Sequence, residues 1–282
     1  MNTPVSEITD LSKSYGKARG IENVSLTVDE GEIFGFIGPN GAGKSTTIRL
    51  LLNLIFPSGG SARIMGMDVT RETKRIKSAV GYIPSDANAY QSMEVREFLG
   101  YCAGFYRLQD ARQRIAELSA WFDLDLRRKI SDLSMGNRKK VAIVQSLLHH
   151  PKLLIVDEPT TGLDPLMQEQ FFELLRIENR RGMTIFFSSH ILSEVQMFCK
   201  RVAVIKEGKI IRIENIETLR SKQLKKVQIV FADSSYERDF AIKGISDIMD
   251  EQGNAISFIY SGEINDLTTL LAKRNILNLT IE

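Results

Sequence analysis

The sequence of 282 residues is long enough for one large domain and one smaller domain. Hydrophobic residues make up 43% of it and charged residues 26%, which is typical of a globular protein with a full core. Because 37 basic and 35 acidic residues leave a formal net charge of only +2, the charge balance argues against a nucleic-acid partner.

Neither a membrane-spanning segment nor a secretion signal is expected. The longest apolar runs, such as "LLNLIF" and "KLLIV", fall far short of the roughly 20 residues that cross a bilayer. The first ten residues contain acidic side chains and no apolar stretch, unlike a signal peptide. Cys102 and Cys199 have no metal-ligand neighbours, so we expect two buried, reduced thiols in a cytoplasmic protein.

The first part of the chain predicts strands around one helix. Residues 5–28 alternate apolar and polar side chains on both sides of a glycine-containing turn, which predicts an antiparallel hairpin. A short apolar strand, "EIFGFIG", runs into a glycine-rich loop, and the next segment, "KSTTIRLLLNLI", has apolar residues at helical spacing. Further short strands are expected in "SARIMG" and "VGYIP".

The remainder predicts an α/β core and a second, smaller domain. Residues 93–150 have helical patterning and resemble an inserted subdomain. Strands and a helix then alternate in "KLLIVDEP", "LMQEQFFELLRIENRRG", "MTIFFSSH" and "VAVIKEGKII", which predicts a largely parallel sheet. From residue 217, the strands "KKVQIVFAD", "AISFIY" and "ILNLTIE" and the helix "DLTTLLAKRN" predict a small α+β domain without a chemical cluster, so we expect regulation or assembly from it.

A phosphate-binding loop is predicted where the apolar strand meets the first helix. The segment "GPNGAGKST" has the P-loop pattern in the strand–loop–helix context that this pattern requires. Backbone N–H groups and the helix dipole would face a polyphosphate, Lys44 would reach the β and γ phosphates, and Ser45 would bind Mg²⁺. The alternative is a generic strand–turn–helix loop. The expected nucleotide-binding residues are Gly38, Asn40, Gly41, Ala42, Gly43, Lys44, Ser45 and Thr46.

Two carboxylates end the strand "LLIVDEP". Because a buried carboxylate is costly unless it is paired or binds a cation, we expect Asp157 to hold Mg²⁺ and Glu158 to polarise the attacking water. The alternative is an acidic cap before Pro159. His190 ends another strand and is expected to contact the γ-phosphate; the alternative is a structural histidine. Tyr15 is expected to stack on the base, or else to pack in the core as an edge aromatic.

Taken in order, these segments resemble the nucleotide-binding subunit of ABC transporters over residues 5–215. "GPNGAGKST" resembles Walker A, "LLIVDE" Walker B, "LSMGN" the family signature and "TTGLD" the D-loop around Asp164; His190 resembles the switch histidine and Tyr15 the A-loop aromatic. The resemblance implies an ABC ATPase cassette over residues 1–216, with an antiparallel β subdomain, a parallel core and a helical subdomain at about 86–150. Residues 217–282 would be the accessory α+β domain.

The resemblance also implies a dimer that closes around ATP. Each ATP would lie between one chain's P-loop and the other chain's signature, where Ser134, Gly136 and Asn137 would approach the γ-phosphate at a helix N-terminus. Asn137 stands where glutamine is usual. The basic residues that follow, Arg138, Lys139 and Lys140, are expected to form a solvated helix face.

The Q-loop departs from the family pattern. Its usual glutamine, which helps to bind Mg²⁺ and senses the transport subunit, would fall at Ser85, and Asp86 is a candidate substitute as metal contact. This form resembles a subset of ABC-2 type exporters that includes bacitracin-resistance and multidrug pumps. Many such relatives continue further, so the chain, which stops at Glu282, is interpreted as a possible truncated form.

The resulting hypothesis is an ATP hydrolase that uses Mg·ATP, forms a homodimer and powers an exporter through a separate multi-span membrane permease, at the inner face of the cell membrane. Aromatic residues within 85–106 would face that permease or else pack the subdomain core. The alternative function is a soluble single-cassette ATPase, for example of the iron–sulfur assembly type. A nucleic-acid ATPase is disfavoured, because there is one cassette, no long heptad insertion and no basic excess.

Overall fold

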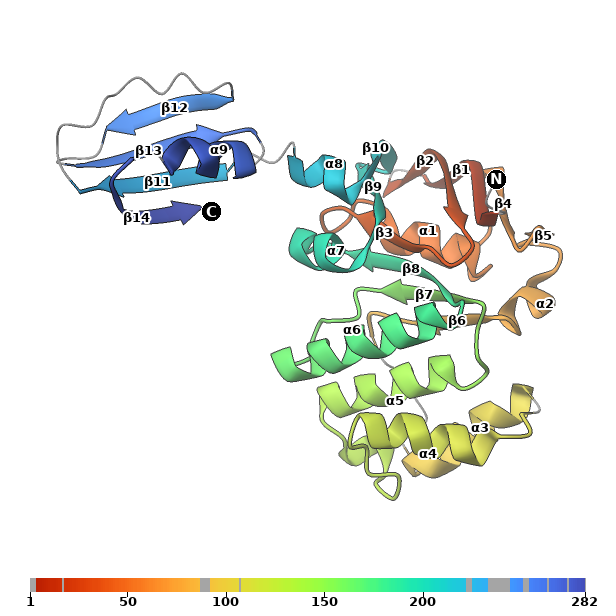
Figure 1. The fold of residues 1–282 in the computed structure, drawn as a ribbon. Coiled ribbons are helices and arrows are strands. Elements are labelled where there is room, and N and C mark those ends of the chain that lie inside the picture. The colour runs from red at the N-terminus through yellow and green to blue at the C-terminus, as the bar shows by residue number, and fades with distance from the viewer. Residues whose placement is uncertain are drawn as a thin grey trace. The chain divides into compact units, whose positions relative to one another are not determined.

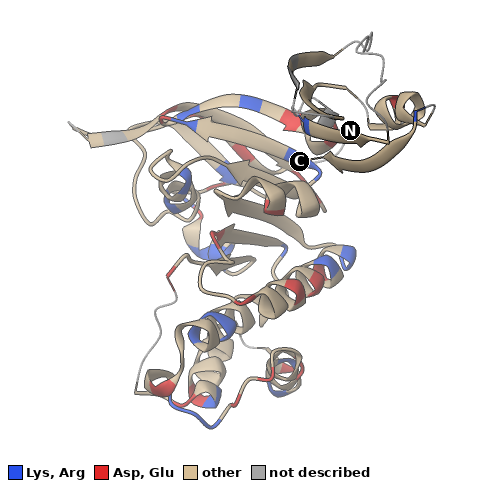
Figure 2. Cartoon of the chain, turned by 90° about the vertical axis from the view of Figure 1, so that its left-hand side faces the viewer, with Lys and Arg blue, Asp and Glu red and all other residues tan. Residues whose placement is uncertain are grey.

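The computed structural model describes most of the chain and divides it into two compact units, Met1–Glu214 and Asn215–Glu282 (Figure 1). The predicted domain boundary, between residues 216 and 217, stays a prediction. Basic and acidic residues are both scattered over the first unit, in keeping with the small net charge (Figure 2). The described residues are 4–16, 18–86, 92–106, 108–221, 225–232, 244–250, 254–262, 264–272 and 274–281.

The first unit begins with an antiparallel sheet in the order β2-β1-β4-β5. The predicted hairpin is present, since β1 and β2 pair antiparallel along their whole length. β1 also pairs with β4, so the hairpin and the segment after the first helix form one surface. The strands are β1 (Pro4–Tyr15), β2 (Ala18–Asp29), β4 (Gly59–Ile64) and β5 (Met67–Asp68).

The second sheet of this unit has six strands in the order β10-β9-β3-β8-β7-β6. The pairs β3/β8, β3/β9, β7/β8 and β6/β7 are parallel. The predicted strand at 202–211 is in fact two strands, because Glu207 and Gly208 both adopt positive φ and turn the chain. The strands are β3 (Ile33–Ile37), β6 (Val80–Ile83), β7 (Leu153–Asp157), β8 (Thr184–Ser189), β9 (Arg201–Lys206) and β10 (Lys209–Asn215).

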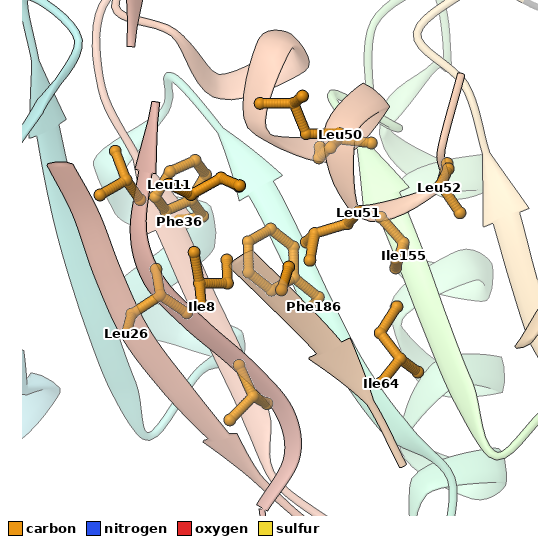
Figure 3. Close-up of a cluster of buried hydrophobic side chains, with 14 of the residues drawn as sticks. Ile8, Leu11, Leu26, Phe36, Leu50, Leu51, Leu52, Ile64, Ile155 and Phe186 are labelled. Atoms are coloured by element: carbon orange, nitrogen blue, oxygen red, sulfur yellow. The ribbon is translucent and has the colours of Figure 1, made fainter. Parts of the chain in front are cut away.

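A hydrophobic core holds the two sheets and the first helix together. In Figure 3, side chains of the antiparallel sheet gather with those of the first helix and of the parallel strands. Phe36 and Phe186 lie in this cluster with ring centroids 5.2 Å apart. The cluster fixes the strand ends of the parallel sheet next to the first helix. Its labelled members are Ile8, Leu11, Leu26, Phe36, Leu50, Leu51, Leu52, Ile64, Ile155 and Phe186.

Helices flank these sheets, and three of them form the predicted inserted subdomain (Figure 1). Ser134 and Asp164 cap α5 and α6, each accepting a hydrogen bond from a backbone N–H of the first turn. The helices are α1 (Lys44–Leu51), α2 (Thr73–Lys77), α3 (Val95–Tyr106), α4 (Ala111–Trp121), the 3₁₀ helix η1 (Ile130–Asp132), α5 (Met135–Leu147), α6 (Pro165–Arg180) and α7 (Leu192–Phe198), and α8 (Ile216–Ser221) belongs to the second unit.

The second unit is a four-stranded sheet in the order β12-β13-β11-β14 with helix α9 against it (Figure 1). Buried apolar residues of the two central strands and of the helix form its own core, and partly buried residues of the two edge strands pack against it. The strand β12 (Ile245–Asp250) was not predicted. The other elements are β11 (Lys225–Phe231), β13 (Ala255–Tyr260), α9 (Ile264–Leu271) and β14 (Ile276–Ile281). The predicted fold class, an α/β ABC-type cassette with a small α+β domain, is confirmed.

Candidate nucleotide-binding site

The site lies at the edge of the parallel sheet where β3, β6, β7 and β8 end. Because these strands are parallel and neighbouring, the segments that follow them meet at one edge. The segments are the loop after Ile37, the residues after Ile83, the pair Asp157–Glu158, and His190. The sheet thus brings together four of the segments that the sequence singled out.

The loop after β3 forms a cradle of the size needed for phosphates. Gly41 and Gly43 adopt positive φ, and a side-chain carbon on Gly43 would lie 2.6 Å from Ile21, so this backbone requires glycine. The loop ends directly at the N-terminus of α1, whose dipole favours an anion. The hollow has a volume of about 300 Å³ and is lined by Gly20, Asn40, Gly41, Gly43, Lys44, Ser45, Thr46, Ser85 and Glu158.

Lys44 connects the cradle to the carboxylate after β7. Its side chain is buried, and its Nζ donates to the carbonyls of Gly38 (2.7 Å) and Pro39 (3.2 Å). The same Nζ lies 3.0 Å from Glu158 Oε1, and Glu158 Oε2 lies 3.3 Å from Nδ1 of His190. The site therefore contains a continuous series of side-chain contacts that links lysine, glutamate and histidine.

Glu158 is held in an unusual backbone conformation. Its φ is +47°, which is uncommon for a non-glycine residue, and its N–H donates to the Ser188 carbonyl (3.0 Å). The side chain is 21% exposed, so a water molecule in the hollow can reach the carboxylate. This arrangement suits a base that acts on water beside a phosphate.

Asp157 lies deeper and has the environment of a cation ligand. Burial raises the pKa of its carboxyl, with Glu158 acting in the same direction, while hydrogen bonds from Ser45 and Ser188 and the charge of Lys44 oppose this shift. Such a buried, incompletely compensated carboxylate next to the Ser45 hydroxyl fits a Mg²⁺ ion. Within the described ranges, no group of three or more His, Cys, Asp or Glu side chains forms a metal site by itself.

Ser85 and Asp86 follow β6, at the place of the expected Q-loop. Ser85 lines the phosphate hollow, whereas Asp86 is exposed and does not line it. Lys139 of α5 reaches this segment with its Nζ, which donates to the carbonyls of Pro84 (2.7 Å) and Ser85 (2.8 Å). Burial lowers the pKa of Lys139 to about 8, although the carboxylates of Asp157, Asp86 and Glu158 act against this shift.

The prediction of a solvated basic face on α5 is wrong. Lys139 is only 3% exposed, and neither Arg138 nor Lys140 is fully exposed. Arg138 donates to the Ser131 carbonyl (2.9 Å) and Lys140 to the Phe122 carbonyl (2.9 Å). Three consecutive basic residues do not reveal these contacts, since the burial of Lys139 depends on how α5 lies against the end of β6.

The expected signature and D-loop lie close together within the chain. The Ser134 hydroxyl accepts from the Asn137 N–H (3.3 Å), and Asp164 caps α6. A side-chain carbon on Gly162 would collide with the methyl group of Met135, so these two loops are in contact. Sequence reasoning missed Met135, which stands between Ser134 and Gly136 and is 65% exposed.

The structure also locates Tyr15 and the aromatic residues of α3, for which the sequence left two alternatives each. Tyr15 is 43% exposed at the end of β1, which contradicts the alternative that it packs in the core. On α3, Phe98 is buried, whereas Tyr101 and Phe105 are exposed and form an edge-to-face pair with centroids 4.9 Å apart. Both Cys102 and Cys199 are buried free thiols, as predicted. No described helix has the length and apolar character that a membrane crossing requires.

Comparisons with known proteins agree with this geometry. The ABC transporter family model matches residues 21–161. The bacitracin transport ATP-binding protein BcrA of Bacillus licheniformis is 34% identical over 82% of this chain and 76% of its own length. The linearmycin resistance ATP-binding protein LnrL of Bacillus subtilis is 35% identical over 72% of this chain and 67% of its own length.

Solved structures also resemble this chain. An ATP-binding subunit of an ABC transporter superposes with a TM-score of 0.73 and 32% identity, covering 77% of this chain and 92% of that structure. A dimeric ATP-binding cassette with ADP and Pi superposes with a TM-score of 0.69 and 25% identity, covering 75% and 98%. The chain therefore belongs to the ABC transporter family of ATP-binding cassettes, which bind nucleotide and hydrolyse ATP.

Proposed function

We propose that this chain is the ATP-hydrolysing subunit of an exporter, in which two copies close around two ATP molecules and drive a separate multi-span membrane permease. The observation that carries the enzymatic part of this proposal is the series of side-chain contacts from Lys44 through Glu158 to His190 at the phosphate cradle. The export part is supported by the relatives, whose names include bacitracin transport, linearmycin resistance and Nod factor export. A location on the inner face of the cell membrane follows from this proposal.

In the proposed mechanism each residue of the cradle has one task. Tyr15 stacks on the base, the 38–46 loop and Lys44 hold the phosphates, and Glu158 takes a proton from the water that attacks the γ-phosphorus in line. Ser45 and Asp157 would hold Mg²⁺, which neutralises phosphate charge when it is bound. His190, next to Glu158, fixes the orientation of that carboxylate and contacts the γ-phosphate.

The second half of each site would come from the partner copy. Ser134, Gly136 and Asn137 would bring the N-terminus of α5 to the partner's γ-phosphate, and Asp164 would lie at the contact between the copies. Support comes from the cap geometry of α5 and from the relatives that were solved as dimers. Closure would then be an ATP-dependent population shift, and hydrolysis would reverse it.

The permease is proposed to dock beside the segment that follows Tyr82. A groove of about 260 Å³ lies there, lined largely by apolar and aromatic side chains that include Tyr82, Pro84 and Tyr106. Phe105, 70% exposed on α3, is the proposed anchor for a cytoplasmic segment of the permease.

Pull-down of the tagged chain from its native host, followed by mass spectrometry, tests the export proposal. We expect a stoichiometric multi-span protein with the wild type. Phe105→Asp should lose this partner and keep ATP hydrolysis, while Ile211→Asp, at a position on strand β10 that is 61% exposed, should keep both. A complex without any hydrophobic partner would contradict the exporter and favour the soluble single-cassette role.

Asp86 is proposed to assist Mg²⁺ binding in place of the missing Q-loop glutamine, together with Ser85. Asp86→Ala should raise the Mg²⁺ concentration for half-maximal hydrolysis about tenfold, because outer-shell partners of a metal act on its affinity. Glu173→Ala, which removes an exposed acid on α6, is the control. An unchanged Mg²⁺ titration of Asp86→Ala would refute the role of this carboxylate.

A further inference from the structure

Helix α5 carries two features that point to different nucleotide sites. Its N-cap, Ser134, belongs to the signature, which is proposed to face the partner's nucleotide. Lys139, five residues later, points into the same chain and donates to the Pro84 and Ser85 carbonyls. One rigid helix therefore joins the signature to the wall of this chain's own phosphate hollow, because Ser85 lines that hollow.

The Lys139 contact is specific rather than incidental. A buried ammonium group is costly unless hydrogen bonds and opposite charges compensate it. Lys139 has both, since two carbonyl groups accept from Nζ and the carboxylates of Asp157, Asp86 and Glu158 interact with its charge. A side chain that has neither a positive charge nor a hydrogen-bond donor would lose all of these interactions at once.

The neighbouring Lys140 offers a matched comparison. Its Nζ also donates to a backbone carbonyl, that of Phe122, at 2.9 Å. Phe122 directly follows α4, so this bond stays within the helical subdomain. Lys139, by contrast, joins the subdomain to the end of β6 in the core sheet. The two lysines differ in what they connect, not in the kind of bond.

We propose that Lys139 is a positioning residue for ATP hydrolysis. Lys139 fixes the backbone at residues 84–85 to the signature helix, so that the signature and the chain's own nucleotide site move together. A shift of α5 towards a partner's nucleotide would then be transmitted to Ser85 and the hollow beside Glu158. The inference goes beyond the proposed export function and rests on the roles proposed for Ser134 and Glu158.

The test compares three variants of the full chain in ATP hydrolysis and in binding of a fluorescent ATP analogue. Lys139→Met keeps an unbranched stem and removes the ammonium; kcat should fall about tenfold, while the Kd for the analogue stays within about threefold. Lys139→Arg, which keeps the charge and the donors, should recover most of the turnover. Lys140→Met should hydrolyse ATP within about twofold of the wild type.

Several results would overturn the inference. One is wild-type kcat in Lys139→Met; another is an equal loss of kcat in Lys140→Met, which would indicate a general weakening of α5. If Lys139→Met fails to fold, Lys139→Ala, a strong helix former without a side-chain donor, replaces it, and full turnover of this variant would equally contradict the inference. Glu158→Gln in the same assay tests the role of Glu158 independently. Normal turnover of this variant would refute the assignment of Glu158, whatever the Lys139 variants show. No membrane subunit is needed, so the export proposal can fail independently.

Discussion

Replacing Glu158 by glutamine is expected to slow ATP hydrolysis by about 10²-fold or more and to leave ATP binding intact. Glutamine has the same size as glutamate but cannot take a proton from water. Lys44 keeps its bonds to the Gly38 and Pro39 carbonyls in the variant, so its ammonium remains in place for phosphate. Loss of the Glu158 charge also removes a competitor of the phosphates for Lys44.

An assay of phosphate release tests the loss of turnover, and an assay of labelled-ATP binding tests separately whether binding is kept. Because the variant binds ATP without consuming it, size-exclusion chromatography with Mg·ATP should show a longer-lived dimer than the wild type shows. Glu173→Gln is the control, since Glu173 is exposed on α6 and remote from the cradle. Turnover of Glu158→Gln within tenfold of the wild type would refute the assignment of Glu158 as the base.

The sequence was sufficient to predict the cradle because its parts are contiguous and lie at strand ends. Gly38 to Thr46 are contiguous, the loop after β3 and the first turn of α1, and Asp157, Glu158 and His190 lie at the ends of apolar strands whose parallel pairing places them at one edge. The topology was therefore implied once the strands had been identified. Ser85 was placed by the family resemblance of the Q-loop, and it follows β6 at the same edge.

Contacts between elements that are distant in the sequence could not be predicted from it. Lys139 has the pattern of a surface residue, and only the docking of α5 against the end of β6 buries it. Strand β12 was missed because Ile245, Ile248 and Met249 have helix-like spacing. The structure explains this spacing by an irregular register between Ser246 and Met249, which interrupts the alternation of a regular strand.

A second large effect is expected from Glu178→Ala, in which the cassette should lose about 3 kcal/mol of stability. Glu178, on α6, is 4% exposed and accepts from Arg114 Nη2 of α4 and from Arg181 Nη1, both at 2.9 Å. Arg114 is equally buried, and its Nε already lacks a hydrogen-bond partner. Without Glu178, Arg114 still pairs with Glu117, but that carboxylate lies 3.9 Å away and is half exposed.

The tryptophan of the chain provides a local probe for this change. Trp121 is the only tryptophan, and its Nε1 donates to the Gln170 carbonyl of α6 at 3.1 Å, so it spans the same two helices as the ion pair. Urea unfolding followed by Trp121 fluorescence therefore reports on the first unit, separately from the second. The midpoint should move to lower urea without a change of slope.

Glu173→Ala is the matched control on the same helix, because Glu173 forms exposed pairs with Arg176 and Arg180 that contribute about 1 kcal/mol or less. The double variant Arg114→Met with Glu178→Leu should recover much of the loss, since it removes the unpaired charge as well as its partner. Equal effects of Glu178→Ala and Glu173→Ala would contradict the importance of burial. If the double variant stayed as unstable as Glu178→Ala, the loss would come from packing between α4 and α6 and not from the charge of Arg114.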